Sequence, residues 1–204
     1  MIQNHEIAKQ QLSKVVFLDR DGVINRDSPD YIKSWSEFEF LPGSLDALKR
    51  LTQKGYAIIL ITNQSAVNRG MISRSDLNSI HENMRSAVSA HGGKIIDIFF
   101  CPHTPDERCS CRKPQPGLIH QAQSRYALDI KKACMVGDSV KDIECAQASG
   151  CGSKILVRTG NGAEAENILI LKNISPDYVA ADLDDAANWI IAHDSTNAIC
   201  PEHA

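Results

Sequence analysis

Short apolar runs alternate along the chain with longer segments in which apolar residues recur every three or four positions. The runs at 15–18 and 57–61 have the length of buried strands, and the segment 44–54 has the periodicity of an amphipathic helix. Strands that alternate with helices are typical of an α/β fold, a parallel sheet covered by helices on both faces. The predicted strands are 15–18, 57–61, 95–100, 133–136, 154–157 and 178–180.

Polar residues and glycines mark the ends of the predicted helices. Ser73 and Ser139 each precede an acidic residue by three positions, Asp76 and Asp142, which is the spacing of a capping box. Gly55 is placed to end the first helix. A capping role therefore accounts for Asp142 without a metal ion. The predicted helices are 44–54, 73–90, 117–126, 139–148 and 183–192.

The chain shows no internal repeat and no low-complexity stretch. We therefore expect a single Rossmann-like domain over residues 1–204, with a core at about 14–192 and a frayed tail at 193–204. The segments 25–41 and 65–73 are too short to form a large cap domain.

Composition and charge exclude several classes of function. The net charge of −3 gives no reason to expect nucleic acid as a partner. No apolar run approaches the roughly 18 residues of a membrane span, and residues 1–12 lack the apolar core of an export signal. We therefore expect a cytoplasmic protein, with a monomer favoured. Seven cysteines, an odd number in such a chain, favour metal binding or free thiols over a disulfide framework.

Polar side chains follow three of the predicted strands. Asp19 and Asp21 follow the first strand, Thr62 and Asn63 the second, and Asp138 the fourth. Ligands of an open parallel sheet bind beyond the carboxyl ends of its strands. The order of the strands thus brings three carboxylates and a hydroxyl to one edge of the sheet.

A carboxylate, a hydroxyl, a lysine and a distal acid occur in that order along nearly the whole chain. They lie in the segments 17–23, 61–65, 112–114 and 136–139, which resemble the four signature motifs of the haloacid-dehalogenase phosphatases. The resemblance implies that Asp19 is the nucleophile and Asp21 the general acid and base. It also implies that Thr62 and Lys113 stabilise the transferring phosphoryl group. The implied ligands of a catalytic Mg²⁺ are Asp19, Asp138 and the backbone carbonyl of Asp21.

A second group of residues has the spacing of a structural metal site. Cys101, His103, Cys109 and Cys111 provide three thiolates and an imidazole within eleven residues. This set suits a tetrahedral Zn²⁺ with no open coordination position. The surrounding loop has little apolar surface, so we expect it to be ordered by zinc and to position Arg112 and Lys113.

The zinc loop narrows the resemblance further. Together with segments 19–22, 62–65 and 111–114, it is similar to that of the D-glycero-D-manno-heptose 1,7-bisphosphate 7-phosphatases. That family implies the loss of the C7 phosphate from a sugar bisphosphate during the synthesis of lipopolysaccharide precursors. Both the 27–31 turn and the 104–108 spacer differ in length from the family pattern, which leaves the anomer preference open. The expected substrate contacts are Asp27, Asp30, Tyr31, Asn63, Gln64, Ser65 and Arg112, the last through the distal phosphate.

Two alternatives remain open at this stage. Histidinol-phosphate phosphatases share the fold and the zinc loop, and a catalytically silent, zinc-stabilised binding module would also account for the cysteines. The chemically competent residues in all four motifs argue against the silent module. Phosphate release in the presence of Mg²⁺ would distinguish the enzyme from the module.

Overall fold

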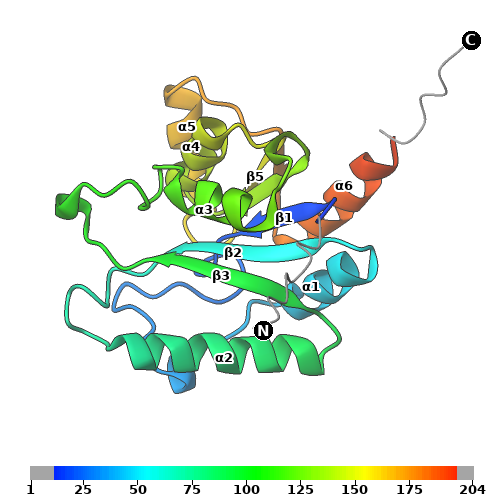
Figure 1. Cartoon of the computed structure of the whole chain (residues 1–204). Helices are drawn as coiled ribbons and strands as arrows, with labels where there is room; N and C mark the ends of the chain where they lie inside the picture. Colours follow the sequence, from blue (N-terminus) through cyan, green and yellow to red (C-terminus); the bar gives the residue numbers. More distant parts are fainter. Residues whose placement is uncertain (1–11, 197–204) are drawn as a thin grey trace, which may run out of the picture.

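The computed structural model describes residues 12–196. The six strands of these residues form one parallel sheet. The order of the strands is β3-β2-β1-β4-β5-β6, and every neighbouring pair is parallel (Figure 1). The strands are β1 (Val15–Leu18), β2 (Ala57–Asn63), β3 (Ile95–Cys101), β4 (Cys134–Gly137), β5 (Ser153–Val157) and β6 (Tyr178–Ala180).

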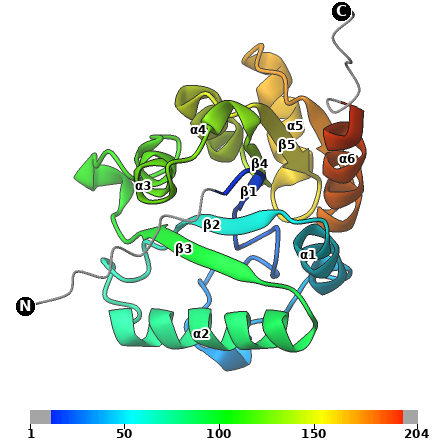
Figure 2. The ribbon, with the colours of Figure 1, turned by 45° about the vertical axis from the view of Figure 1, so that its right-hand side comes forward.

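Helices cover both faces of the sheet. The helices α1, α2 and α6 lie on one face, and α3, α4 and α5 lie on the other (Figure 2). Three short 3-10 helices lie in the connections, at Trp35–Glu37, Pro105–Glu107 and Ile130–Lys132. The α-helices are α1 (Ser44–Gln53), α2 (Arg74–Ala90), α3 (Gly117–Tyr126), α4 (Val140–Ser149), α5 (Gly162–Leu171) and α6 (Leu183–Thr196).

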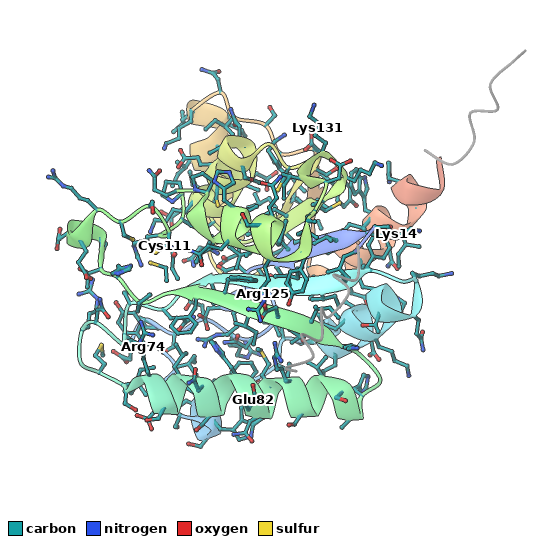
Figure 3. All side chains as sticks on the ribbon, viewed as in Figure 1. Lys14, Arg74, Glu82, Cys111, Arg125 and Lys131 are labelled. Carbon is teal, nitrogen blue, oxygen red and sulfur yellow. The ribbon has the colours of Figure 1, made fainter. Side chains whose placement is uncertain are left out.

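Alternate residues of the central strands serve two separate cores. In β1, Val16 and Leu18 pack into the cluster that includes α1, α2 and α6, whereas Val15 and Phe17 pack into the cluster under α3. Successive side chains of a strand point to opposite faces of its sheet, so a strand buried on both faces is apolar throughout. Side chains fill both layers between the sheet and the helices (Figure 3).

The chain reverses its direction of travel across the sheet at β1. It runs from β1 to β2 and β3 on one side, and then returns to place β4 on the other side of β1. The junction of β1 and β4 is therefore the topological switch point, the place where open α/β sheets bind ligands. The backbone N–H of Asp19 donates to Val136 O at 3.0 Å, which joins the two strand ends there.

The predicted α/β fold is confirmed, with six strands in the predicted places. Three details differ from the sequence prediction. Helix α5 was not predicted, Thr62 and Asn63 are the last residues of β2 instead of following it, and α6 continues four residues further, to Thr196. His193, the first of these four residues, stacks on Trp189 with ring centroids 4.0 Å apart. The expectations for residues 1–11 and 197–204 lie outside the described residues. Within 12–196, no helix is long and apolar enough to cross a membrane.

Candidate active site

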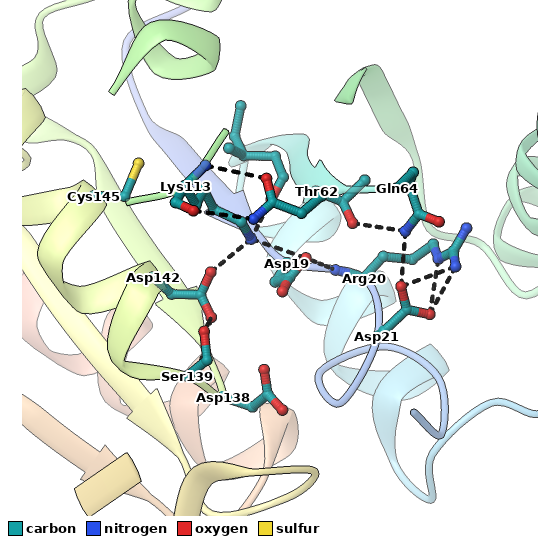
Figure 4. A network of polar contacts seen from close by, with 12 residues as sticks. Asp19, Arg20, Asp21, Thr62, Gln64, Lys113, Asp138, Ser139, Asp142 and Cys145 are labelled. Atoms are coloured by element: carbon teal, nitrogen blue, oxygen red, sulfur yellow. Dashed lines mark hydrogen bonds and ion pairs between the residues drawn. The ribbon is translucent and has the colours of Figure 1, made fainter. Parts of the chain in front are cut away.

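Three carboxylates and one lysine meet at the switch point. Asp19 follows β1, Asp138 follows β4 and Asp142 lies in the first turn of α4. One oxygen of each lies within 4.8 Å of the others. The ammonium of Lys113 lies 3.0 Å from Asp19 Oδ1 and 2.6 Å from Asp142 Oδ1 (Figure 4). The structure thus brings Asp19, Asp138 and Lys113 together, and Asp142 joins them.

The charges of this cluster do not balance. Burial and the nearby carboxylates raise the pKa of Asp138 to about 8. Burial, which outweighs the attraction of Lys113, raises the pKa of Asp19 to about 6. Although burial opposes it, the attraction of Asp142 and Asp19 raises the pKa of Lys113. When all three carboxylates are ionised, they share one ammonium and two negative charges lack a partner in the cluster, so this set of oxygen ligands fits a divalent cation.

Asp138 is held in place by backbone that approaches it closely. Asn161 donates to Asp138 Oδ2 from its backbone N–H at 2.8 Å and from its side chain at 3.1 Å. Gly22 and Gly160 both have positive φ, and a Cβ on either would clash with the Asp138 carboxylate. Only glycine tolerates both a positive φ and so close a neighbour. The backbone at these two positions can therefore pack directly against the Asp138 carboxylate and hold it over the end of the sheet.

The residues at the end of β2 position Thr62 and Lys113. Gln64 Nε2 donates to Thr62 Oγ1 at 2.9 Å, which leaves the hydroxyl hydrogen of Thr62 for another acceptor. Asn63 accepts from Lys113 N at 3.1 Å and donates to Lys113 O at 3.2 Å. Lys113 Nζ also donates to Ile61 O at 2.7 Å. The loop that carries Lys113 is therefore attached to the second strand by side chain and backbone.

The side chain of Asp21 points away from the carboxylate cluster, toward Arg20 and Gln64 (Figure 4). Asn25 Nδ2 donates to the same carboxylate at 2.9 Å. Burial alone would raise the pKa of Asp21, but the charge of Arg20 and the hydrogen bonds from Arg20, Asn25 and Gln64 hold it below its ordinary value. In the substrate-free protein the pKa of Asp21 is therefore lowered, whereas the pKa values of Asp19 and Asp138 are raised.

The four predicted zinc ligands lie together, Cys101 as the last residue of β3 and the other three in the loop after it. Their sulfur and nitrogen atoms are separated by 3.3–3.6 Å in the five close pairs, and all four lie within 4.8 Å of one another. A tetrahedral site with Zn–S bonds of about 2.3 Å has ligand separations only slightly larger than these. Arg112 Nη1 donates to His103 O at 3.0 Å, so the loop also holds Arg112. The cluster could hold a metal ion.

A cavity of about 330 Å³ opens over Asp19 and Lys113. Most of the predicted substrate contacts line it, including Arg112 from the zinc loop. Asp30 is exposed and lies outside this lining. An adjacent cavity of about 600 Å³ shares Arg112 and Lys141 and is also lined by Arg108. The predicted contacts that line the first cavity are Asp27, Tyr31, Asn63, Gln64, Ser65 and Arg112.

Three features of the site were not predicted from the sequence. Asn161, which binds Asp138, lies just beyond the motifs, and Lys141, which lines both cavities, lies inside a capping box that gave it no role of its own. His81, which contacts Arg20, had a readable signal. It stands four residues after Leu77, on the apolar stripe of its helix, where a buried polar residue calls for a partner.

The fold and the site together define a hydrolase of the haloacid-dehalogenase type. Residues 110–186 match the family model described as HAD-hydrolase-like. The chain is 46% identical over 149 residues to the D-glycero-beta-D-manno-heptose-1,7-bisphosphate 7-phosphatase of Bordetella bronchiseptica. The aligned residues make up 73% of this chain and 83% of that relative. The chain belongs to the family of heptose-1,7-bisphosphate 7-phosphatases, as the resemblance of its motifs predicted.

Two further comparisons agree with this assignment. The crystal structure of D,D-heptose 1,7-bisphosphate phosphatase from B. bronchiseptica, complexed with magnesium and phosphate, has a TM-score of 0.82 and 41% identity, and the match covers 88% of this chain and 99% of that one. The D-glycero-alpha-D-manno-heptose-1,7-bisphosphate 7-phosphatase of Photorhabdus laumondii is 38% identical over 170 residues, or 79% of this chain and 92% of that relative. Relatives named for either anomer are therefore similar to this chain.

Proposed function

We propose that this chain is a Mg²⁺-dependent phosphomonoesterase that removes the C7 phosphate of D-glycero-D-manno-heptose 1,7-bisphosphate. The observation that carries the proposal is the contact between Asp19 and Lys113 at the switch point, with Thr62 beside them at the end of β2. A nucleophilic carboxylate, a cation and a hydroxyl donor are the groups that phosphoryl transfer requires. The family named above supplies the substrate.

In the first step, an oxygen of Asp19 attacks phosphorus and the bond from phosphorus to the C7 oxygen breaks. Asp21 takes up a proton as the substrate binds and gives it to the departing oxygen, and the product is an aspartyl-phosphate on Asp19. Thr62 donates its hydroxyl hydrogen to the phosphoryl group, and Lys113 places a positive charge beside it.

In the second step, water attacks phosphorus, Asp21 takes a proton from that water, and the bond between phosphorus and Asp19 breaks. Phosphate leaves and both carboxylates return to their starting states. Asp19, Asp138 and the backbone carbonyl of Asp21 are the proposed ligands of Mg²⁺, which when bound would offset the negative charge of the carboxylates and the phosphoryl group.

The charges around the two cavities favour a bisphosphate. Arg108, Arg112 and Lys141 line the cavity beside the reacting centre and offer three cations to a second phosphate. A guanidinium fork matches phosphate oxygens in particular. Histidinol phosphate has no second phosphate and carries an imidazole at the end away from its phosphate, so it offers these cations no anionic partner.

The test is the rate of phosphate release by the purified chain with Mg²⁺. The substrates are the α and β anomers of heptose 1,7-bisphosphate and histidinol phosphate, and Asp19→Asn is the control for contaminating phosphatases. We expect kcat/KM for at least one heptose anomer to exceed that for histidinol phosphate by more than about 100-fold. This ratio corresponds to the loss of two charge-assisted hydrogen bonds to a second phosphate. A preference for histidinol phosphate would contradict the proposed substrate, and no turnover of any of the three would contradict the enzyme.

The second metal of the proposal is a structural Zn²⁺ held by Cys101, His103, Cys109 and Cys111. Four protein ligands leave no position for a reacting water, so this metal would act by holding the loop that carries Arg112 and Lys113. All six strands of the described residues belong to one sheet, which supports a single-domain enzyme. The monomeric state and the cytoplasmic location stay predictions.

A further inference from the structure

In the sequence, Arg20 stands between Asp19, the proposed nucleophile, and Asp21, the proposed acid and base. The side chain of Arg20 is only 1% exposed. A buried guanidinium is costly unless its charge is paired. Nε and Nη2 of Arg20 donate to Asp21 Oδ1 at 3.1 and 2.7 Å, and Nη2 also donates to Asp21 Oδ2 at 2.9 Å. The guanidinium therefore contacts both oxygens of Asp21 and restricts their rotation.

The opposite side of the guanidinium contacts helix α2. Arg20 Nη1 lies 3.4 Å from Nε2 of His81, which is itself 4% exposed. Burial and the charge of Arg20 lower the pKa of His81 to about 3, so the imidazole is neutral and can accept a hydrogen bond at Nε2. The ring of His81 also packs edge-on against Phe100, at 5.8 Å between centroids. A continuous polar chain thus runs from α2 through Arg20 to Asp21.

We propose that Arg20 is a positioning residue for Asp21 and that His81 in turn orients Arg20. The inference rests on the phosphatase function proposed above. A carboxylate that moves a proton to a departing oxygen must present one lone pair in a fixed direction. Asn25 and Gln64 each give Asp21 a single hydrogen bond, whereas the fork of Arg20 defines the plane of its carboxylate. His81, which contacts the guanidinium on the side opposite Asp21, holds this fork in place.

This role has a signature that ordinary packing does not have. A sugar alkoxide is a poor leaving group and needs the proton of Asp21, whereas a nitrophenolate leaves without it. A misdirected Asp21 should consequently reduce kcat/KM for the heptose bisphosphate more than for p-nitrophenyl phosphate. Both reactions use the same nucleophile and the same phosphoryl site, so the ratio of the two kcat/KM values isolates proton transfer from the fold.

The test compares His81→Leu, which removes the acceptor, with His81→Gln, whose amide oxygen can accept from Arg20. We expect His81→Leu to lower kcat/KM for the heptose bisphosphate about 10-fold and that for p-nitrophenyl phosphate less than about 3-fold, with His81→Gln close to wild type. Ile80→Val, a change of packing on the same helix, should leave the ratio unchanged. Equal losses on both substrates, or equal losses in the Leu and Gln variants, would overturn the proposal.

Arg20→Lys provides a second route if His81→Leu does not fold. Lysine keeps the charge but lacks the fork, so the same leaving-group dependence should appear. A wild-type ratio in folded Arg20→Lys would overturn the proposal. If the wild-type chain releases phosphate from neither substrate with Mg²⁺, the proposed function fails first and this inference fails with it.

Discussion

The ammonium of Lys113 lies 2.6 Å from Asp142 Oδ1, and both side chains are buried. The other oxygen of Asp142 accepts from the backbone N–H of Ser139 at 3.0 Å and from its hydroxyl at 2.6 Å. One carboxylate therefore caps helix α4 and holds Lys113 beside Asp19. The capping role expected from the sequence is confirmed, and the ion pair adds a second role.

The two roles of Asp142 can be separated by substitution. Asp142→Asn keeps an oxygen acceptor for the cap but loses the charge, whereas Asp142→Ala loses both. We expect both variants to lose turnover about 10-fold or more, because Lys113 loses one of its two anchoring carboxylates. Asp142→Ala should also unfold more easily than Asp142→Asn, by about 1 kcal/mol for the cap. Urea titration and turnover measure the two effects, and equal stability of the two variants would contradict the capping role.

Asp19→Asn should abolish turnover and leave the fold intact. The amide is nearly isosteric with the carboxylate but is a poor nucleophile, so we expect a loss of about 10³-fold or more. The metal-free variant should melt no lower than the wild type, because one of three crowded carboxylates is gone. Asp46→Asn, an exposed aspartate on α1, is the matched control and should keep full activity. Substantial turnover in homogeneous Asp19→Asn would remove Asp19 from the nucleophile role.

The stability of the metal-free protein should depend on pH through Asp138. With the pKa of Asp138 raised from 3.8 to about 8, the folded protein keeps a proton that the unfolded chain has already released. The free energy of unfolding should therefore fall as pH rises from about 4 to about 8. The rise of the pKa of Asp19 to about 6 acts in the same direction over the lower part of this range.

Thermal melts in excess chelator, from about pH 5 to about pH 8, measure this dependence. Added Mg²⁺ should raise the melting temperature most at the upper end, where both carboxylates are ionised. Asp138→Asn has no such proton to lose and should show a flatter profile. If the melting temperature of the metal-free wild type instead rises with pH across this range, the raised pKa of Asp138 is contradicted.

Loss of the zinc loop should damage activity indirectly. Lys113 stands two residues beyond Cys111, so disorder of the loop should displace the ammonium that contacts Asp19. We expect Cys109→Ser and Cys111→Ser to lose zinc, melt at lower temperature and turn over more slowly. Cys151→Ser, outside the cluster, is the control. Elemental analysis, melts and turnover are the measurements, and zinc-free wild type purified without chelator would refute the structural metal.

The strands could be predicted from the sequence because the central ones are buried on both faces. Every residue of β1 is buried, so its apolar run is continuous. Helix α5 was missed for a physical reason. It follows Gly160 and Asn161, which indicate a turn, and its apolar residues are consecutive near its end, where Ile170 and Leu171 are 68% and 82% exposed. The buried stripe, Gly162, Ala165 and Leu169, contains two small residues and one leucine, so it gives only a weak hydrophobic pattern.

The site was predictable to the extent that strand ends define it. Asp19, Thr62 and Asp138 follow from the order of the strands alone. The hydrogen bonds between Asn63 and Lys113, fifty residues apart in sequence, depend on how the loop that carries Lys113 returns to the sheet. The periodicity of apolar residues does not predict the path of that loop. The contact of Arg20 with His81 is of the same kind. A pattern of apolar positions gives the buried face of a helix but not the partner of a polar residue on it.

The central claim is that the Asp19 site removes the phosphate on the primary C7 oxygen and spares the anomeric one. The most direct test follows both phosphorus resonances of heptose 1,7-bisphosphate by ³¹P NMR, during incubation with the purified chain and Mg²⁺. We expect the C7 phosphomonoester signal to disappear, inorganic phosphate to grow in equal amount and the anomeric signal to persist, with no change in the Asp19→Asn sample. Loss of the anomeric signal first, or a spectrum that does not change, would contradict the account.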